Sequence, residues 1–275
     1  HPRAVLGDIL EKAARDPRTG DAGRRKIGDY YAACMDEAGV ERAVTIPPAF
    51  CGWDASYALD ALAHHRDWLA VAVLVDPLDP QGPQQLERYV REFGVCGLRL
   101  QRRIPRPWEF EDERSTPLWA KAEELGITLD VNATHEEYPQ VERRIRQFPH
   151  LRMVLDHCGY VSAELRPRIP TVERVVQLAR YPNVYAKLTF FGIANDEPYP
   201  FPSLHWLARQ LIEAFGAERC LYGSNFPTAQ YNQKMSYPQT VQLFSEAMEL
   251  SAGERKWILG GTAEQLWRWG HHKGA

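Results

Sequence analysis

The sequence is poor in cysteine, and its few cysteines are not spaced for a shared structural task. It has five, an odd number, and no two form a CxxC pair: they are Cys34, Cys51, Cys96, Cys158 and Cys220. A disulfide framework and a zinc ribbon both depend on suitably paired cysteines, so the pattern argues against each of them. We therefore expect reduced thiols and a cytoplasmic protein.

Long apolar runs, blocks of like charge and phosphate-binding glycine motifs are also absent. No run approaches the roughly 20 apolar residues that cross a bilayer. The 33 basic and 36 acidic residues give a net charge of -3 and are spread along the chain, which favours a small-molecule partner over nucleic acid or a membrane. No GxGxxG or GxxxxGK[ST] motif follows a strand-like run, so nucleotide-binding doubly wound folds lose support.

What the sequence does contain is a strict alternation of short apolar runs with segments of helical period. The runs cover 42–46, 69–75, 95–100, 127–131, 151–155, 184–189 and 220–222, and the helical segments about 24–38, 54–66, 81–93, 116–125, 136–147, 171–180, 203–215, 237–250 and 253–268. This alternation predicts a parallel sheet covered by helices. An α/β fold of the (β/α)8 TIM-barrel type, as one domain over residues 1–275, matches the typical length of about 250 residues.

Such a barrel needs eight strands, whereas seven are visible. The first helical segment precedes the first visible strand, so we expect the remaining strand to lie before residue 1. The opening residues HPR include no initiating Met and no apolar core of a signal peptide. An open sheet of seven strands is the alternative.

In a TIM barrel the active site is formed at the carboxyl ends of the strands. Polar side chains gather there in this sequence, at Arg99, Gln101, Arg102, Arg103, Asp130, Asn132, Asp156, His157, Tyr160, Lys187, Thr189 and Asn225. The three arginines suit a substrate carboxylate, because forked guanidinium donors match it, or they could pair with carboxylates of the rim. Lys187 shares a strand face with Tyr185, and in the barrel interior it should pair with Asp156 or Asp130.

Six segments, taken together, resemble the amidohydrolase-2 branch of the amidohydrolase superfamily. They are AGVERAV (38–44), GLRL (97–100), LDHCG (155–159), PNVYAKL (182–188), FGAERCLYGSNFP (215–227) and ILGGTA (258–263), and the resemblance spans about residues 28–268. It implies a (β/α)8 barrel with a His-x-His pair on its first strand, a His on its sixth and a catalytic Asp on its eighth. His157 matches the sixth-strand His and is the candidate metal ligand. A single His often caps a loop or satisfies a buried carbonyl, but the place of His157 on a glycine-containing turn after an apolar run favours a site role.

Asn225 stands where the branch carries its catalytic Asp. The resemblance implies an acid that takes a proton from water or binds a divalent metal, and an amide has no accessible basic pKa for that task. Three explanations stay open. We favour an engineered, inactive Asp-to-Asn form; the others are a natural protein whose base or metal ligand comes from elsewhere, and a non-catalytic binder that keeps the pocket.

The sequence and the resemblance together predict a hydrolase that opens a lactone, or a similar cyclic ester or amide, of an anionic small molecule. The expected catalytic residues are Asn225, as the position of the acid, and His157. The expected substrate-binding residues are Arg99, Arg102, Arg103, Tyr160 and Lys187. One zinc ion or none, and a monomer or a homo-oligomer, remain open, and the alternatives are a metal-dependent non-oxidative decarboxylase and a silent ligand-binding barrel.

Overall fold

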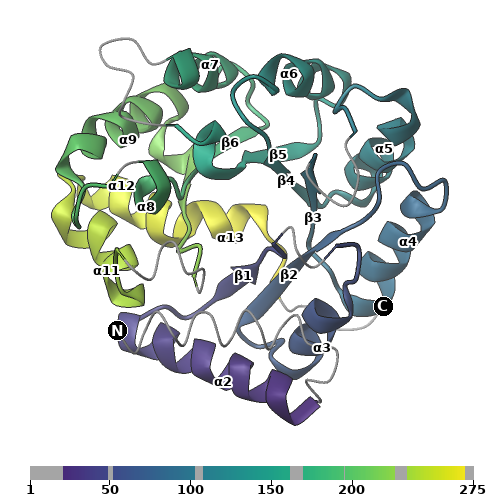
Figure 1. Cartoon of the computed structure of the whole chain (residues 1–275), viewed down its shortest axis with the longest axis horizontal. Helices are drawn as coiled ribbons and strands as arrows, with labels where there is room; N and C mark the ends of the chain where they lie inside the picture. The colour runs from purple at the N-terminus through teal and green to yellow at the C-terminus, as the bar shows by residue number, and fades with distance from the viewer. Residues whose placement is uncertain are drawn as a thin grey trace.

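Seven parallel strands form the centre of the molecule. The computed structural model describes residues 21–48, 52–102, 108–161, 170–194, 196–226 and 234–269. The strands are β1 (Ala43–Thr45), β2 (Leu69–Leu74), β3 (Gly97–Gln101), β4 (Thr128–Asn132), β5 (Arg152–Leu155), β6 (Val184–Leu188) and β7 (Cys220–Tyr222). They pair in chain order, each parallel to the next. All seven predicted strands are confirmed, and Figure 1 shows the sheet curling on itself with helices around its outside.

The helices follow the predicted alternation, with short π-helical and 3-10 turns added. The long ones are α2 (Asp21–Ala38), α3 (Ser56–His64), α5 (Thr116–Leu125), α6 (Tyr138–Gln147), α7 (Pro170–Leu178) and α9 (Pro202–Phe215). Two more continue as π-helices: α4 (Gly82–Arg88) into η2 (Tyr89–Phe93), and α11 (Tyr237–Gln242) into η7 (Leu243–Ala247). The last predicted helix is divided into α12 (Ala252–Lys256), η8 (Trp257–Gly261) and α13 (Thr262–Leu266). The remaining elements are η3 (Glu113–Ser115), η4 (Asp156–Gly159), α8 (Phe191–Ala194) and η6 (Ala217–Arg219). None of the described helices is long and apolar enough to cross a membrane.

Strand alternation divides the side chains between an outer core and the barrel interior. On β3, Leu98 and Leu100 belong to the large apolar core. Successive side chains point to opposite faces, so Arg99 and Gln101 point into the barrel. The pairing register sets Arg99 opposite Asp130 and Gln101 opposite Asn132 on β4. The fold thus brings polar groups from neighbouring strands together inside the barrel.

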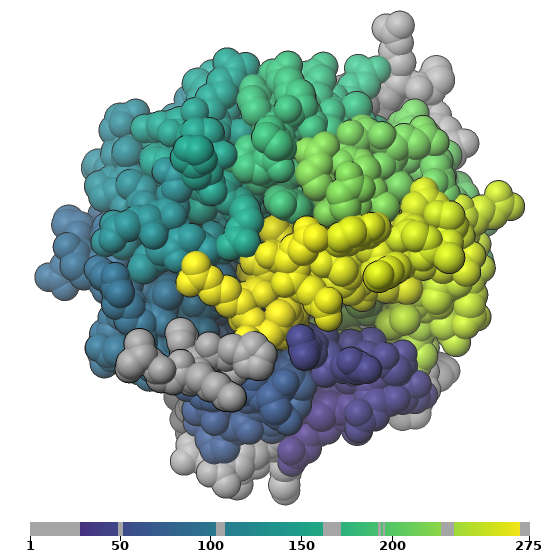
Figure 2. All heavy atoms as spheres, turned by 180° about the vertical axis from the view of Figure 1, so that it is seen from behind, coloured from purple at the N-terminus to yellow at the C-terminus, as the bar shows by residue number. Residues whose placement is uncertain are grey.

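The amino-terminal end of the barrel is covered by the last helical segment. The hydroxyl of Thr128, at the start of β4, donates a hydrogen bond to the carbonyl oxygen of Leu266 at 2.6 Å. Trp267 packs so closely on Gly97 that a Cβ atom at that glycine would lie 2.6 Å from the indole ring. Figure 2 shows this C-terminal segment, in yellow, crossing the back of the molecule above the purple helix α2. The opposite end, where the strands terminate, is where the polar side chains gather.

A cavity of about 800 Å³ extends along the interior. Among the described residues, β1 pairs only with β2 and β7 only with β6, so these two strands are the edges of the sheet. Residues of both edges line the cavity, including Val44 of β1 and Tyr222 of β7. The cavity therefore follows the unpaired side of the curled sheet from Trp267 up to the carboxyl ends of the strands.

Candidate active site

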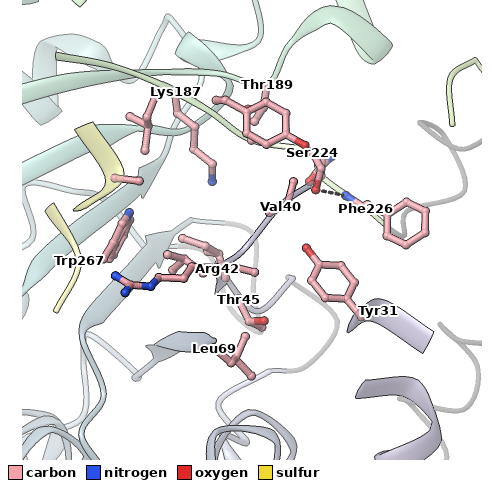
Figure 3. Close-up of a pocket in the computed structure, with 18 of the residues that line it drawn as sticks. Tyr31, Val40, Arg42, Thr45, Leu69, Lys187, Thr189, Ser224, Phe226 and Trp267 are labelled. Carbon is pink, nitrogen blue, oxygen red and sulfur yellow. Dashed lines mark hydrogen bonds between the residues drawn. The ribbon is translucent and has the colours of Figure 1, made fainter. Parts of the chain in front are cut away.

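The cavity collects most of the polar side chains that the sequence places at strand ends. Those that line it are Arg99, Gln101, Asn132, Tyr160, Lys187, Thr189 and Asn225, and Ser224 lines it as well. In Figure 3, Lys187 extends its ammonium group into the cavity from β6, and Tyr31 of α2 faces the cavity from the other side. The site is therefore built from five strands or the turns that follow them, as expected for a barrel of parallel strands.

Four charged side chains form a closed network inside the barrel. Lys187 Nζ lies 2.8 Å from Asp156 Oδ1 and 3.2 Å from Asp130 Oδ2. Arg99 donates from Nη2 to Asp156 Oδ2 at 2.9 Å, and its Nε lies 3.8 Å from Asp130 Oδ1. The predicted pairing of Lys187 with these carboxylates is confirmed. Two cations and two carboxylates balance, which is what allows four charges to be buried at once.

The network shifts the two carboxyl groups in opposite directions. Burial and the neighbouring Asp156 carboxylate raise the pKa of Asp130, against the opposing effects of Lys187 and Arg99. Burial also acts to raise the pKa of Asp156, but His157, Lys187 and Arg99 outweigh it and bring that pKa well below its usual range. For Lys187, burial is outweighed by Asp130 and Asp156, so its pKa is raised. Lys187 and Asp156 are consequently ionised at neutral pH.

The turn after β5 has an unusual backbone. His157, Cys158, Gly159 and Tyr160 have φ values of 53°, 48°, 70° and 59°, four consecutive residues in the left-handed region. Each non-glycine residue there carries a cost of about 1–2 kcal/mol, and such strain tends to occur where a site requires it. Gly159 is required for a second reason, because a Cβ would lie 2.7 Å from the hydroxyl of Tyr138. Nothing in the sequence pattern predicts this turn beyond its single glycine.

The turn sets Tyr160 on the cavity wall and His157 behind it. Tyr160 and the amide of Asn132 exchange hydrogen bonds at 2.8 and 3.1 Å, and Asn132 also donates to Asp156 Oδ2 at 2.9 Å. The imidazole of His157 is 6% exposed and lies 5.0 Å from the Tyr160 ring, measured between centroids. Burial lowers the pKa of His157 to about 4, although Asp156 opposes that shift. His157 is therefore neutral at pH 7 and reaches the cavity only through its neighbours.

Thr189 is the neighbour that links His157 to the cavity. Its Oγ1 lies 2.7 Å from His157 Nδ1, and on the other side of the ring His157 Nε2 lies 3.2 Å from Asp156 Oδ2. Gly223, just after β7, packs against Thr189 so closely that a Cβ there would lie 2.3 Å from the threonine methyl group. The sequence indicates that Thr189 lies at a strand end, but it predicts no function for this residue. The signal available was its position two residues after Lys187, on the same face of the chain.

The three arginines do not act together. Arg99 lines the cavity, whereas Arg102 does not. Arg102 donates to Glu137 Oε1 at 2.6 Å, to the Trp108 carbonyl oxygen at 2.6 Å, and to Glu109. Arg103 lies outside the described residues. At the carboxyl ends of the strands, the cationic groups that line the cavity are therefore Arg99 and Lys187.

Asn225 lies on the turn after β7 and lines the cavity. Its φ is 49°, a left-handed conformation that asparagine and aspartate adopt more readily than most residues. Beside it, the backbone N–H of Phe226 donates to Ser224 Oγ at 3.2 Å, the bond drawn dashed in Figure 3. The Phe226 ring packs against Tyr31 and Tyr237 with centroids 5.9 and 5.0 Å away. The polar site thus has an aromatic wall on the side of residue 225.

The described residues do not fit a divalent-metal site. None of their His, Cys, Asp and Glu side chains forms a group of three or more that could hold an ion. The carboxylates of Asp156 and Asp130 are already paired, Asp156 with Lys187 and Arg99 and Asp130 with Lys187.

Comparison with known proteins places the chain in a family. The family model for Amidohydrolase matches residues 14–269. L-fucono-1,5-lactonase of Burkholderia ambifaria is 26% identical over 230 residues, 80% of this chain and 78% of its own length. 4-Sulfomuconolactone hydrolase of Hydrogenophaga intermedia is 24% identical over 232 residues, 83% of this chain and 74% of its own.

A solved structure supports the same fold. It is an uncharacterised TIM-barrel protein from Bordetella bronchiseptica, 18% identical, with a TM-score of 0.70 over 95% of this chain and 90% of its own. At this identity the likeness shows the fold alone, and it confirms the TIM-barrel prediction. Since the family model also covers most of the sequence, the chain belongs to the amidohydrolase family.

Proposed function

We propose that this protein is a hydrolase that opens a lactone carrying a carboxylate. The observation that carries the proposal is a cavity at the carboxyl ends of the strands that presents Arg99 and Lys187 together with hydroxyl and amide side chains, in a chain of the amidohydrolase family. Two relatives are named for lactones, and one of those names describes a sulfonated, hence anionic, lactone. These names support the substrate class and leave the particular lactone to experiment.

The anionic group of the substrate would bind at Lys187 and Arg99. Lys187 points into the cavity (Figure 3), and its ammonium group has three donors, of which Asp130 and Asp156 engage two. Arg99 Nε is buried and makes no hydrogen bond. Each cation therefore has a donor left over for a ligand after binding its carboxylate.

Gln101 offers a neutral donor beside these cations. Its side chain lines the cavity and is 3% exposed, and its amide nitrogen is buried without a hydrogen bond. A buried amide nitrogen that is left unpaired costs about 1–3 kcal/mol. A substrate oxygen that accepts from Gln101 would recover this cost, so we assign Gln101 to orienting the lactone.

Asn225 would contact the reacting carbonyl without taking a proton. Its amide can donate to an oxyanion as negative charge develops, as asparagine does in other hydrolytic sites. It cannot serve as the base for water. We therefore propose that this chain binds its lactone well and turns it over more slowly than a form with aspartate at 225.

Binding of matched ligands tests the anion site without altering the protein. A carboxylate-bearing lactone should bind at least about 10-fold more tightly than its methyl ester, because charge-assisted hydrogen bonds to Lys187 and Arg99 are lost in the ester. Titration calorimetry at two salt concentrations measures both constants. Equal affinities for acid and ester would remove the carboxylate from the proposal.

A further inference from the structure

Three tyrosines from different elements meet beside the turn that carries residue 225. They are Tyr31 of α2, Tyr222 at the end of β7 and Tyr237 at the start of α11, and all three line the cavity. The rings of Tyr31 and Tyr237 meet edge to face, with centroids 5.8 Å apart. Helix α2 is therefore in contact, through Tyr31, with the segment that follows the last strand.

The hydroxyl groups of these tyrosines converge on Ser224. Tyr31 forms side-chain hydrogen bonds with Ser224 and Tyr237, and Figure 3 shows Tyr31 directing its hydroxyl toward Ser224. Tyr222 also forms a side-chain hydrogen bond with Ser224. Burial raises the pKa of all three tyrosines. Their hydroxyls are consequently neutral at pH 7 and serve as hydrogen-bond donors and acceptors.

Ser224 connects this hydroxyl cluster to the backbone of the turn. Its Oγ accepts a hydrogen bond from the backbone N–H of Phe226 at 3.2 Å, and this bond closes the backbone around residue 225. Asn225 has a φ of 49°, so a small change in the turn would move its side chain along the cavity wall. The Phe226 ring packs against Tyr31 on the other side of the turn, with centroids 5.9 Å apart. The position of the side chain at 225 therefore depends on where Ser224 Oγ is fixed.

Packing alone does not require the hydroxyl of Tyr31. Phenylalanine would fill the same space, and a hydroxyl removed from water without a partner costs about 1–3 kcal/mol. The hydroxyl of Tyr222 has another partner at hand in Thr240 Oγ1, at 2.7 Å. The hydroxyl of Tyr31 has its partners in Ser224 and Tyr237, on the far side of the cavity from α2. It is thus the group that ties α2 to the turn.

We propose that Tyr31 is a positioning residue, whose hydroxyl fixes Ser224 and thereby the turn that presents the side chain of residue 225 to the lactone carbonyl. The catalytic part of this inference rests on the proposed function. Tyr31 acts through Ser224 and does not contact the reacting atoms. Helix α2 accordingly belongs to the site, together with the ends of the strands.

The kinetic test compares two variants in the Asn225→Asp form. Tyr31→Phe should lower kcat at least about 10-fold and leave KM nearly unchanged, since a misplacement of about 1 Å can cost about 100-fold in rate. Because Tyr31 acts through Ser224, adding Tyr31→Phe to Ser224→Ala should slow the reaction no further. Losses that multiply in the double variant, or a rise in KM without a fall in kcat, overturn the positioning role.

Hydrogen exchange tests the same contact without substrate. In the present chain, Tyr31→Phe should speed exchange of the Phe226 amide, which donates to Ser224 Oγ, at least about 10-fold by NMR. Tyr181→Phe is the matched control, because the Tyr181 hydroxyl donates to Glu142 Oε1 at 2.7 Å and does not line the cavity. It should change neither the exchange at Phe226 nor kcat.

The two measurements separate this inference from the proposed function. Unchanged exchange at Phe226 in Tyr31→Phe overturns the positioning role, even in a chain that hydrolyses lactones. If the Asn225→Asp form consumes no lactone, the proposed function fails, and the exchange result alone decides whether Tyr31 fixes the turn.

Discussion

The Asn225→Asp variant is expected to hydrolyse carboxylate-bearing lactones at least about 100-fold faster than the present chain, since a positioned general base contributes about 10²–10⁴ in rate. Residue 225 lies on the turn after β7 and lines the same cavity as Thr189 and Lys187. A carboxylate there can take the proton from the water that attacks the lactone carbonyl. Its backbone φ of 49° suits aspartate as well as asparagine, so the exchange should not disturb the turn.

The control for this gain is Asn225→Ala, which removes the amide without adding an acid. The alanine variant should show no gain in rate. Initial rates of hydrolysis are measured from proton release over a panel of lactones and are compared among the aspartate variant, the alanine variant and the present chain. An aspartate variant no faster than the present chain would show that residue 225 does not act on the water.

The Lys187→Met variant is expected to lose about 3 kcal/mol or more of unfolding free energy, because removing one partner of a buried ion pair leaves an uncompensated charge. Lys187 is within 3.2 Å of both Asp130 and Asp156, which are fully buried. Without it, Arg99 alone faces two carboxylates. Urea unfolding followed by circular dichroism measures the loss.

Two further variants separate charge balance from lost packing. Lys121→Met removes a lysine that pairs with Glu87 and Glu124 at the surface, and it should cost about 1 kcal/mol or less. Adding Asp130→Asn to Lys187→Met restores neutrality and should recover a large part of the loss. Asp130 is the right partner to neutralise, because burial and Asp156 already raise its pKa. A Lys187→Met variant as stable as Lys121→Met would contradict the account of the network.

The sequence was informative about the fold because the strands are buried on both faces. The run 69–75 is entirely apolar, and β2 occupies all of it but its last residue. The same logic predicted the pairing of Lys187, since a charge on the inner face of a strand needs a carboxylate from a neighbouring strand. Elements set by local apolar pattern, and contacts set by strand parity, could therefore be predicted.

The details of the site could not be read in the same way. The contact between His157 and Thr189 joins residues 32 positions apart and depends on the left-handed turn after β5, for which the sequence shows only a glycine. Arg102 matched a substrate-binding pattern as well as Arg99 did. It is instead held by glutamates on a loop and at the start of a helix, and no periodicity reveals such contacts.

For residue 225, the sequence identified the position of the side chain but not the reason for the amide. The resemblance identified its position, and the structure places its side chain on the cavity wall. That the amide is an engineered change stays a prediction. The structure adds that Thr189, on the wall of the same cavity, contacts His157, with 2.7 Å between Oγ1 and Nδ1.

The central claim is that this cavity adds water across a lactone bond, and the product formed by the Asn225→Asp variant tests it most directly. The variant should be incubated with a carboxylate-bearing lactone in water enriched in oxygen-18, with mass spectrometry of the product and measurement of released carbon dioxide. The account predicts a hydroxy acid heavier than the lactone by one labelled water, with no carbon dioxide. Release of carbon dioxide would indicate a decarboxylase instead, and binding without conversion of any lactone would indicate a silent binding barrel.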